Sequence, residues 1–201
     1  MEGIIILALA VFLLTSAGER DTRTTKAPIA ADPKTQSVRP VFKYQKPDGY
    51  QQIDGWRLRS FIKRFKTEYP DHQVETLANT IIKHSKIYDI DPKLMAALIA
   101  RESSFDIRAK SSTGALGLGQ IKPFNFSWLG ISNPYDPEQN IKGVAIMMRD
   151  LLNKWEGHTL QIELSLASYK EGYNAVKKRK TYNNDTKIYI EDIKEYRKNL
   201  N

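Results

Sequence analysis

The sequence predicts a mainly α protein with one compact, multi-helix domain. Apolar residues recur at intervals of three and four along several segments, which is typical of amphipathic helices. No sustained alternation of apolar and polar residues occurs, so strands are not expected. Residues 51–201 are numerous enough to bury one adequate hydrophobic core. Together these observations favour a single helical domain.

The predicted helices follow one another from residue 53 onward. The third is the most distinctive: Asp91 is a good N-cap, Pro92 suits the first helical position, and the run Leu94–Ala100 is apolar on nearly all sides. Such a helix should lie inside the core. The other helices are marked by these apolar positions: Trp56, Phe61 and Phe65; Val74, Leu77, Ile81, Ile82, Ser85 and Tyr88; Val144, Ile146, Met147, Leu151 and Leu152; Ile162, Leu164, Leu166 and Ala167; Ile190, Ile193, Tyr196 and Leu200.

The chain divides into three parts. Residues 1–18 have the pattern of an export signal, because the apolar run Ile4–Leu14 is followed by small residues at positions 15–18. That run is shorter than the roughly 20 residues of a standard membrane span. The residues before this run include Glu2 and no Lys or Arg, whereas an export signal usually begins with positive charge. An uncleaved N-terminal anchor is therefore the alternative. Residues 19–50, rich in Thr, Pro, Lys and Asp, should form a flexible linker, and residues 51–201 the folded domain.

Composition excludes several chemistries. The chain has no Cys, which rules out disulfides, thiolate metal sites and a lipid-modified Cys anchor. Its three His residues lack metal-ligand spacing, so neither a metal nor a cofactor is expected. A net charge of +8 would attract an anionic polymer outside the cytoplasm as the binding partner. No nucleic-acid motif accompanies that charge, so nucleic acid is not the expected partner, and a monomer is expected.

The segment from Glu102 to Gln120 carries the functional signal. Glu102 falls in the last turn of the apolar helix, where burial and the helix dipole both disfavour a carboxylate and so raise its pKa. A general acid working near neutral pH needs a raised pKa. The small-residue loop that follows, with Gly117 and Gly119, would let a backbone approach a ligand closely. This combination indicates a glycan-cleaving site, although a lone helix-end glutamate is more often simply solvated.

Four motifs in order, from about Ile81 to Val176, resemble the lytic transglycosylase domain of the soluble-lytic-transglycosylase type, which is related in fold to goose-type lysozyme. They are Glu102-Ser103, the glycine-rich segment 114–120, Asp136-Pro137-Glu138-Gln139-Asn140-Ile141, and the segment 168–172; residues 189–196 continue the likeness more weakly. The resemblance implies a lysozyme-like fold with an active-site cleft. It also implies cleavage of the MurNAc-GlcNAc β-1,4 bond of peptidoglycan glycan strands, with 1,6-anhydro-MurNAc ends.

The resemblance assigns roles by position. Glu102 is the general acid and then the base, with the substrate's N-acetyl group as the internal nucleophile. Tyr169 is a phenol that could orient Glu102, and Asn140 is a structural residue at a helix start. The substrate-binding candidates are Ser103 (whose alternative role is a local cap), Ser111, Gly117, Gln120, Lys122, Tyr169 and Lys170.

Two departures from the family pattern matter most: Gly119 stands in place of a Met, and Lys170 in place of an Asn. These departures keep a non-catalytic wall-binding or assembly protein as one alternative. A lysozyme-type muramidase is the other, with Glu171 as its candidate second carboxylate. In each case the protein should be exported to the periplasm or cell envelope, secreted or tethered to the membrane through its N-terminus.

Overall fold

The structure is a computed structural model that describes residues 53–200. The predicted signal or anchor (1–18) and linker (19–50) lie outside the described residues. The mainly α fold is confirmed: within residues 53–200 the only β pairing consists of isolated bridges, in which Leu116 pairs with Lys110 and with Ile121. No helix of this part of the chain is both long and apolar enough to cross a membrane.

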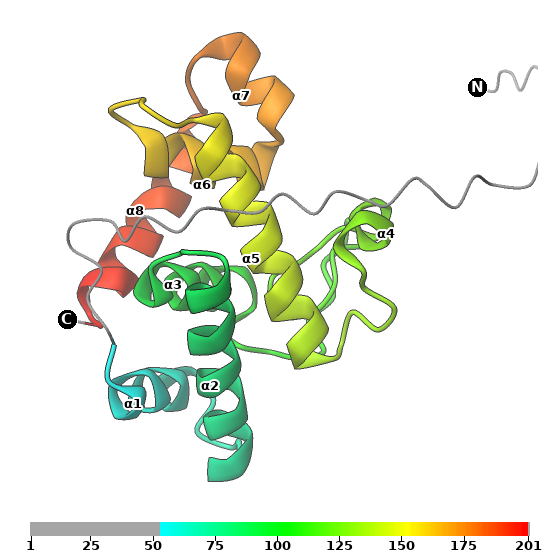
Figure 1. Cartoon of the computed structure of the whole chain (residues 1–201), viewed down its shortest axis with the longest axis vertical. Coiled ribbons are helices and arrows are strands. Elements are labelled where there is room, and N and C mark those ends of the chain that lie inside the picture. Colours follow the sequence, from blue (N-terminus) through cyan, green and yellow to red (C-terminus); the bar gives the residue numbers. More distant parts are fainter. Residues whose placement is uncertain (1–52, 201) are drawn as a thin grey trace, which may run out of the picture. The chain divides into compact units, whose positions relative to one another are not determined.

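The helices arise where the apolar periodicity predicts them, and Figure 1 shows their arrangement. Two short elements and α7 were not predicted, because they are too brief to carry a helical period. In chain order the elements are α1 (Gly55–Phe65), α2 (Asp71–Ile87), α3 (Pro92–Ser103), the 3₁₀ turn η1 (Pro123–Asn125), α4 (Phe126–Leu129), α5 (Pro137–Lys154), α6 (Gln161–Glu171), α7 (Tyr173–Arg179) and α8 (Asn184–Lys198).

Helix α3 is the central element of the domain, as its sequence predicts. The carboxylate of Asp91 caps it by accepting a hydrogen bond from the backbone N–H of Lys93 at 2.9 Å. Every residue from Pro92 to Ala100 is buried. Figure 1 shows α3 enclosed by neighbouring helices, and its packing partners are α1, α2 and α8. Only the last turn, which carries Glu102, is partly rather than fully buried.

An aromatic cluster fixes the chain just beyond that turn. Ser104 and Phe105 have left-handed backbone angles (φ 50° and 60°), which end the helix abruptly. The ring of Phe105 is fully buried and meets Phe61 and Phe65 edge to face, at centroid distances of 6.0 and 5.6 Å. Tyr69 adds a 3.3 Å hydrogen bond from its hydroxyl to the Phe105 carbonyl. The position of Glu102 is therefore set by the core beneath it.

Candidate active site

Glu102 lies in the last turn of α3 and is held by a tyrosine from α8. The hydroxyl of Tyr189 donates a 2.5 Å hydrogen bond to Oε1 of Glu102. Tyr189 is buried, and burial is the main cause that raises its pKa, followed by the charge of Glu102, so its hydroxyl keeps its proton and acts as a donor. Helices far apart in the sequence thus meet at the candidate acid.

The electrostatic environment of Glu102 suits a proton donor. Burial raises the pKa of its carboxyl group from 4.5 to about 7. Three influences act in the opposite direction: the hydrogen bond from Tyr189 and the positive charges of Arg101 and Lys170. Burial is the stronger effect, as expected for a carboxylate removed from water. Near neutral pH the group can both hold and release a proton, as a general acid and base must.

Two cations lie against the ring of Tyr189. The Arg101 guanidinium carbon is 5.4 Å from the ring centroid, and the Lys170 ammonium is 5.0 Å from it. Each cation has a second anchor: Arg101 donates to Asp192 at 2.8 Å, and Lys170 to the backbone carbonyl of Asp185 at 3.0 Å. Lys170, the departure from the family's Asn, therefore stands beside the pair of Tyr189 and Glu102.

The buried amide of Asn140 organises the glycine-rich loop. Asn140 lies in the first turn of α5, with no exposed surface. Its Oδ1 accepts the N–H of Gly119 at 2.8 Å, while its Nδ2 donates to the carbonyls of Leu116 at 3.2 Å and Pro134 at 2.8 Å. A buried amide satisfied in this way is costly to replace. Asn140 is a structural residue at a helix start, as predicted, and it also fixes the loop.

Close packing explains why the loop contains glycines. A Cβ at Gly117, which has φ +72°, would lie 2.2 Å from the Pro134 carbonyl oxygen. A Cβ at Gly119 would lie 2.1 Å from Cγ2 of Val144. The side chain of Val144 therefore occupies the position that any side chain at residue 119 would need. Gly119 is therefore matched to its close neighbours Val144 and Tyr169 in this chain.

The predicted contact between Tyr169 and Glu102 is not a hydrogen bond in this structure. The Tyr169 hydroxyl instead donates to the carbonyl of Gly119 at 2.7 Å, while Tyr189 contacts the acid. Burial raises the pKa of Tyr169, and the charge of Glu102 raises it further, so the two groups share one electrostatic environment. Tyr169 joins α6 to the glycine-rich loop.

The other predicted substrate-binding residues make local contacts. Gln120, at φ 48°, donates from Nε2 to the Gly117 carbonyl at 3.0 Å. Ser111 accepts the Ala115 N–H on its hydroxyl at 2.9 Å, and Ser103 donates to the Ile99 carbonyl at 3.3 Å, which agrees with local capping. The remaining candidate, Lys122, donates to the carbonyl and hydroxyl oxygens of Thr113 at 2.7 and 2.6 Å.

The other carboxylates near this segment are committed elsewhere. Glu171, the candidate second acid, forms an ion pair with Arg179 and accepts the backbone N–H of Asn183. Asp106 accepts the N–H of Arg108 at 2.8 Å in a turn. Across residues 53–200, no carboxylate is among the groups that shift the pKa of Glu102. The same residues contain no group of three or more His, Asp or Glu side chains that could hold a metal ion.

With this geometry, the chain's place among known proteins is clear. Residues 79–191, more than half of the chain, match the family described as the transglycosylase SLT domain, and the chain belongs to that family. The matched range contains Glu102, the glycine-rich loop, Asn140 and Tyr189. The likeness that the four motifs suggest is therefore confirmed over the whole site.

Two relatives illustrate the range of similarity. The transglycosylase of Enterobacteria phage PRD1 is 38% identical over 95 residues, which cover 47% of this chain and 34% of the phage protein. Membrane-bound lytic murein transglycosylase F of Desulfosudis oleivorans is 31% identical over 137 residues, covering 67% of this chain and 28% of the relative. The chain thus matches at most about a third of the length of either relative.

Solved structures of lytic transglycosylases also align with the chain. The 70 kDa soluble lytic transglycosylase of Escherichia coli aligns with 71% of this chain and 26% of its own, at 18% identity and a TM-score of 0.48. The alignment with an inactive mutant of the lytic transglycosylase Slt of Pseudomonas aeruginosa covers 71% of this chain and 27% of the Slt chain, at 19% identity and a TM-score of 0.47.

Proposed function

We propose that this protein is a peptidoglycan lytic transglycosylase that uses Glu102 as its acid and base. The observation that carries the proposal is a single carboxyl group with a pKa of about 7, held by Tyr189 in a domain of the transglycosylase SLT family. A group with this pKa is protonated often enough at neutral pH to donate, and its conjugate base is strong enough to accept.

The resemblance to lytic transglycosylases implies how one carboxyl group can carry out the reaction. Glu102 donates its proton to the glycosidic oxygen while the bond from that oxygen to C1 of N-acetylmuramic acid breaks. The carbonyl oxygen of the sugar's own N-acetyl group forms a bond to C1. Glu102, now a carboxylate that accepts a hydrogen bond from Tyr189, takes the proton of the sugar's 6-hydroxyl. The 6-oxygen then displaces the N-acetyl oxygen, which leaves a 1,6-anhydro ring and restores the acid without consuming water.

The main alternative is a muramidase, in which a second carboxylate activates water or attacks C1. Glu171 is the candidate that the sequence offers, but its ion pair with Arg179 and its hydrogen bond from Asn183 favour a structural role. A non-catalytic wall-binding protein is the other alternative. Close packing of Gly119 against Val144 disfavours it, because the family departure is compensated locally.

Variants of the two glutamates test the proposal. Purified sacculi are incubated with wild type, Glu102→Gln and Glu171→Gln, and released muropeptides are identified by mass spectrometry. Glu102→Gln should lose at least about 100-fold in rate, the usual scale for general acid–base help. Glu171→Gln should keep its activity if Glu171 only pairs with Arg179. A comparable loss in both variants would favour the two-carboxylate hydrolase, and full activity of Glu102→Gln would refute the assignment.

The same proposal includes the protein's location and organisation. Residues 1–18 act as an export signal or membrane anchor, and residues 19–50 as a linker that lets the domain formed by residues 51–201 reach the wall as a monomer. Its place of action is the periplasm or cell envelope. Cell fractionation with N-terminal sequencing tests this, because a cleaved N-terminus identifies a signal and an intact one in the membrane fraction identifies an anchor.

A further inference from the structure

We propose that a groove between α1 and α2 is a second binding site, which takes the charged stem peptides of the wall polymer. This proposal rests on the proposed function, since it assumes that the polymer is peptidoglycan. The groove has a volume of about 710 Å³ and is lined by residues between Trp56 and Glu75. All of them precede residues 79–191, so the groove lies outside the matched family segment and outside the site of Glu102.

The first wall of the groove, α1, carries three basic residues: Arg59, Lys63 and Arg64. Lys63 is already neutralised, because its ammonium lies 3.0 Å from Asp71 and donates to the Tyr69 carbonyl at 2.6 Å. Arg59 and Arg64 have no carboxylate within ion-pair distance anywhere in the part of the chain that the structure describes. A guanidinium is a planar fork of donors that matches a carboxylate.

Apart from Asp71, which pairs with Lys63, the rest of the lining adds an apolar surface and one negative charge. Trp56 is 57% exposed at the groove, although an indole of this size is usually largely buried. Glu75, on α2, lies across from the arginines and forms no ion pair within the described residues. The groove therefore presents two positive groups, one negative group and an aromatic surface.

This combination selects one class of ligand. A short peptide that carries carboxylates and a free amine can pair with Arg59, Arg64 and Glu75 at once, and stem peptides of peptidoglycan have these groups. A purely anionic polymer such as nucleic acid would pair with the arginines but would leave Glu75 facing a like charge. The chain's own residues 19–50 contain seven Lys or Arg against four Asp or Glu, so they are repelled by the arginines. Charge complementarity thus favours the wall peptide.

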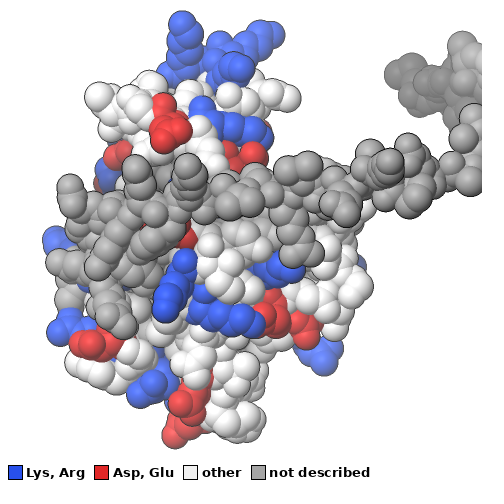
Figure 2. Space-filling view, in the orientation of Figure 1, with Lys and Arg blue, Asp and Glu red and all other residues white. Residues whose placement is uncertain are grey.

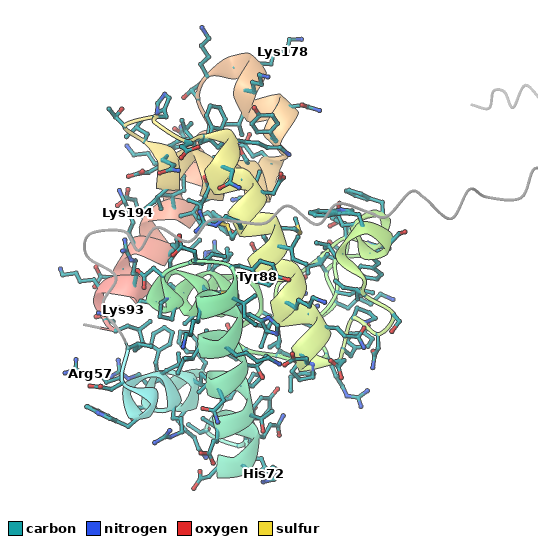
Figure 3. All side chains as sticks on the ribbon, viewed as in Figure 1. Arg57, His72, Tyr88, Lys93, Lys178 and Lys194 are labelled. Atoms are coloured by element: carbon teal, nitrogen blue, oxygen red, sulfur yellow. The ribbon has the colours of Figure 1, made fainter. Side chains whose placement is uncertain are left out.

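A binding assay on the full chain tests the groove separately from catalysis. Glu102→Gln is used as the background so that sacculi stay intact, and bound protein is measured by co-sedimentation over a range of salt. The groove variant is Arg59→Gln with Arg64→Gln. The control is Lys86→Gln with Lys178→Gln, which removes two positive charges from exposed sites on α2 and α7; Figure 3 shows Lys178 at the far end of α7. Figure 2 shows that Lys and Arg side chains also gather at that end. The control therefore measures how much nonspecific electrostatic attraction contributes to binding.

The groove variant should bind intact sacculi about tenfold more weakly than the background protein, which is what two exposed Arg–carboxylate contacts are worth together. It should show no such loss on sacculi whose peptides have been removed with an amidase. The control should change little on either material. Equal binding by the groove variant, an equal loss in the control, or the same loss on peptide-free glycan would each overturn the proposal.

Reversing the charge of Glu75 separates the peptide from other occupants. Glu75→Lys should weaken binding if the groove takes a ligand with a free amine, whereas it would strengthen binding of a purely anionic polymer. Tighter binding of Glu75→Lys to sacculi, or release of wild type by duplex DNA that depends on Arg59 and Arg64, would refute the assignment to stem peptides. Because these measurements do not involve turnover, their failure would leave the proposed lytic activity standing.

Discussion

Replacing Glu102 with Gln should stabilise the folded protein in alkaline solution and have little effect in acid. Glutamine keeps the shape of the protonated side chain but cannot ionise. The wild-type carboxyl group must be ionised above its pKa, and burial makes that state costly in the folded protein. If removal of this candidate catalytic residue stabilises the fold, the site is maintained at the expense of stability.

The size of the effect follows from the pKa values. The pKa of Glu102 rises from 4.5 to about 7 on folding. Between these values the folded protein retains a proton that the unfolded chain has lost, so the stability of the wild type falls as pH rises through this window. A difference of about 2.5 units at 1.36 kcal/mol per unit gives about 3 kcal/mol above pH 7. The Gln variant escapes this loss, and below about pH 4.5 the two proteins should be nearly equal in stability.

Urea unfolding at about pH 4 and about pH 9 measures the effect directly. The exposed glutamate Glu195 provides a control, because Glu195→Gln removes the same charge from the surface of α8. If Glu102→Gln is no more stable than wild type at alkaline pH, then Glu102 is a solvated helix-end residue. The physical basis for its role as a general acid would then fail.

Three further predictions concern the neighbours of Glu102. Tyr189→Phe removes a hydrogen bond that lowers the pKa of Glu102, so that pKa should rise. The alkaline limb of the pH–activity profile should then move to higher pH by about one unit. An unmoved limb would show that the hydrogen bond does not influence the acid. The positive charge of Lys170 also lowers the pKa of Glu102, so Lys170→Met should shift that limb in the same direction at low salt, and Lys170→Arg should not. Identical pH profiles for both variants would make Lys170 an ordinary surface lysine. Gly119→Met should lower the free energy of unfolding by about 1–3 kcal/mol, because the new side chain would collide with Val144. Adding Val144→Ala should restore part of that loss. Strictly additive effects of the two substitutions would contradict the packing argument.

The sequence predicts those features that depend on local pattern. The long helices follow from apolar periodicity, and the buried α3 follows from Asp91, Pro92 and the apolar run after them. Glu102 could be identified as the candidate acid because its two determinants, the end of a buried helix and a glycine-rich loop, are contiguous in the sequence. The resulting pKa of about 7 has the predicted direction, and its largest cause, burial, is one of the two causes that the sequence predicts.

Features that depend on tertiary packing could not be predicted in this way. Tyr189 reaches Glu102 across 87 positions of sequence, and its only signal was a weak continuation of the family pattern. The choice between Tyr169 and Tyr189 depends on how α6 and α8 pack, which periodicity does not determine. The fit of Gly119 to Val144 likewise depends on where α5 lies. The amide of Asn140 is predictable as a helix-start residue, but its three loop contacts are not.

The central claim is that Glu102 cleaves the glycan without water as the nucleophile, and the fate of water in the reaction tests it most directly. Sacculi are digested by the wild-type protein in water enriched in heavy oxygen, and the new glycan ends are analysed by mass spectrometry. If Glu102 acts alone with the substrate's N-acetyl group, the products carry 1,6-anhydro ends, each lighter by one water and free of the label, and Glu102→Gln yields none. Reducing ends that contain heavy oxygen would contradict the account, because they would show that water is the nucleophile.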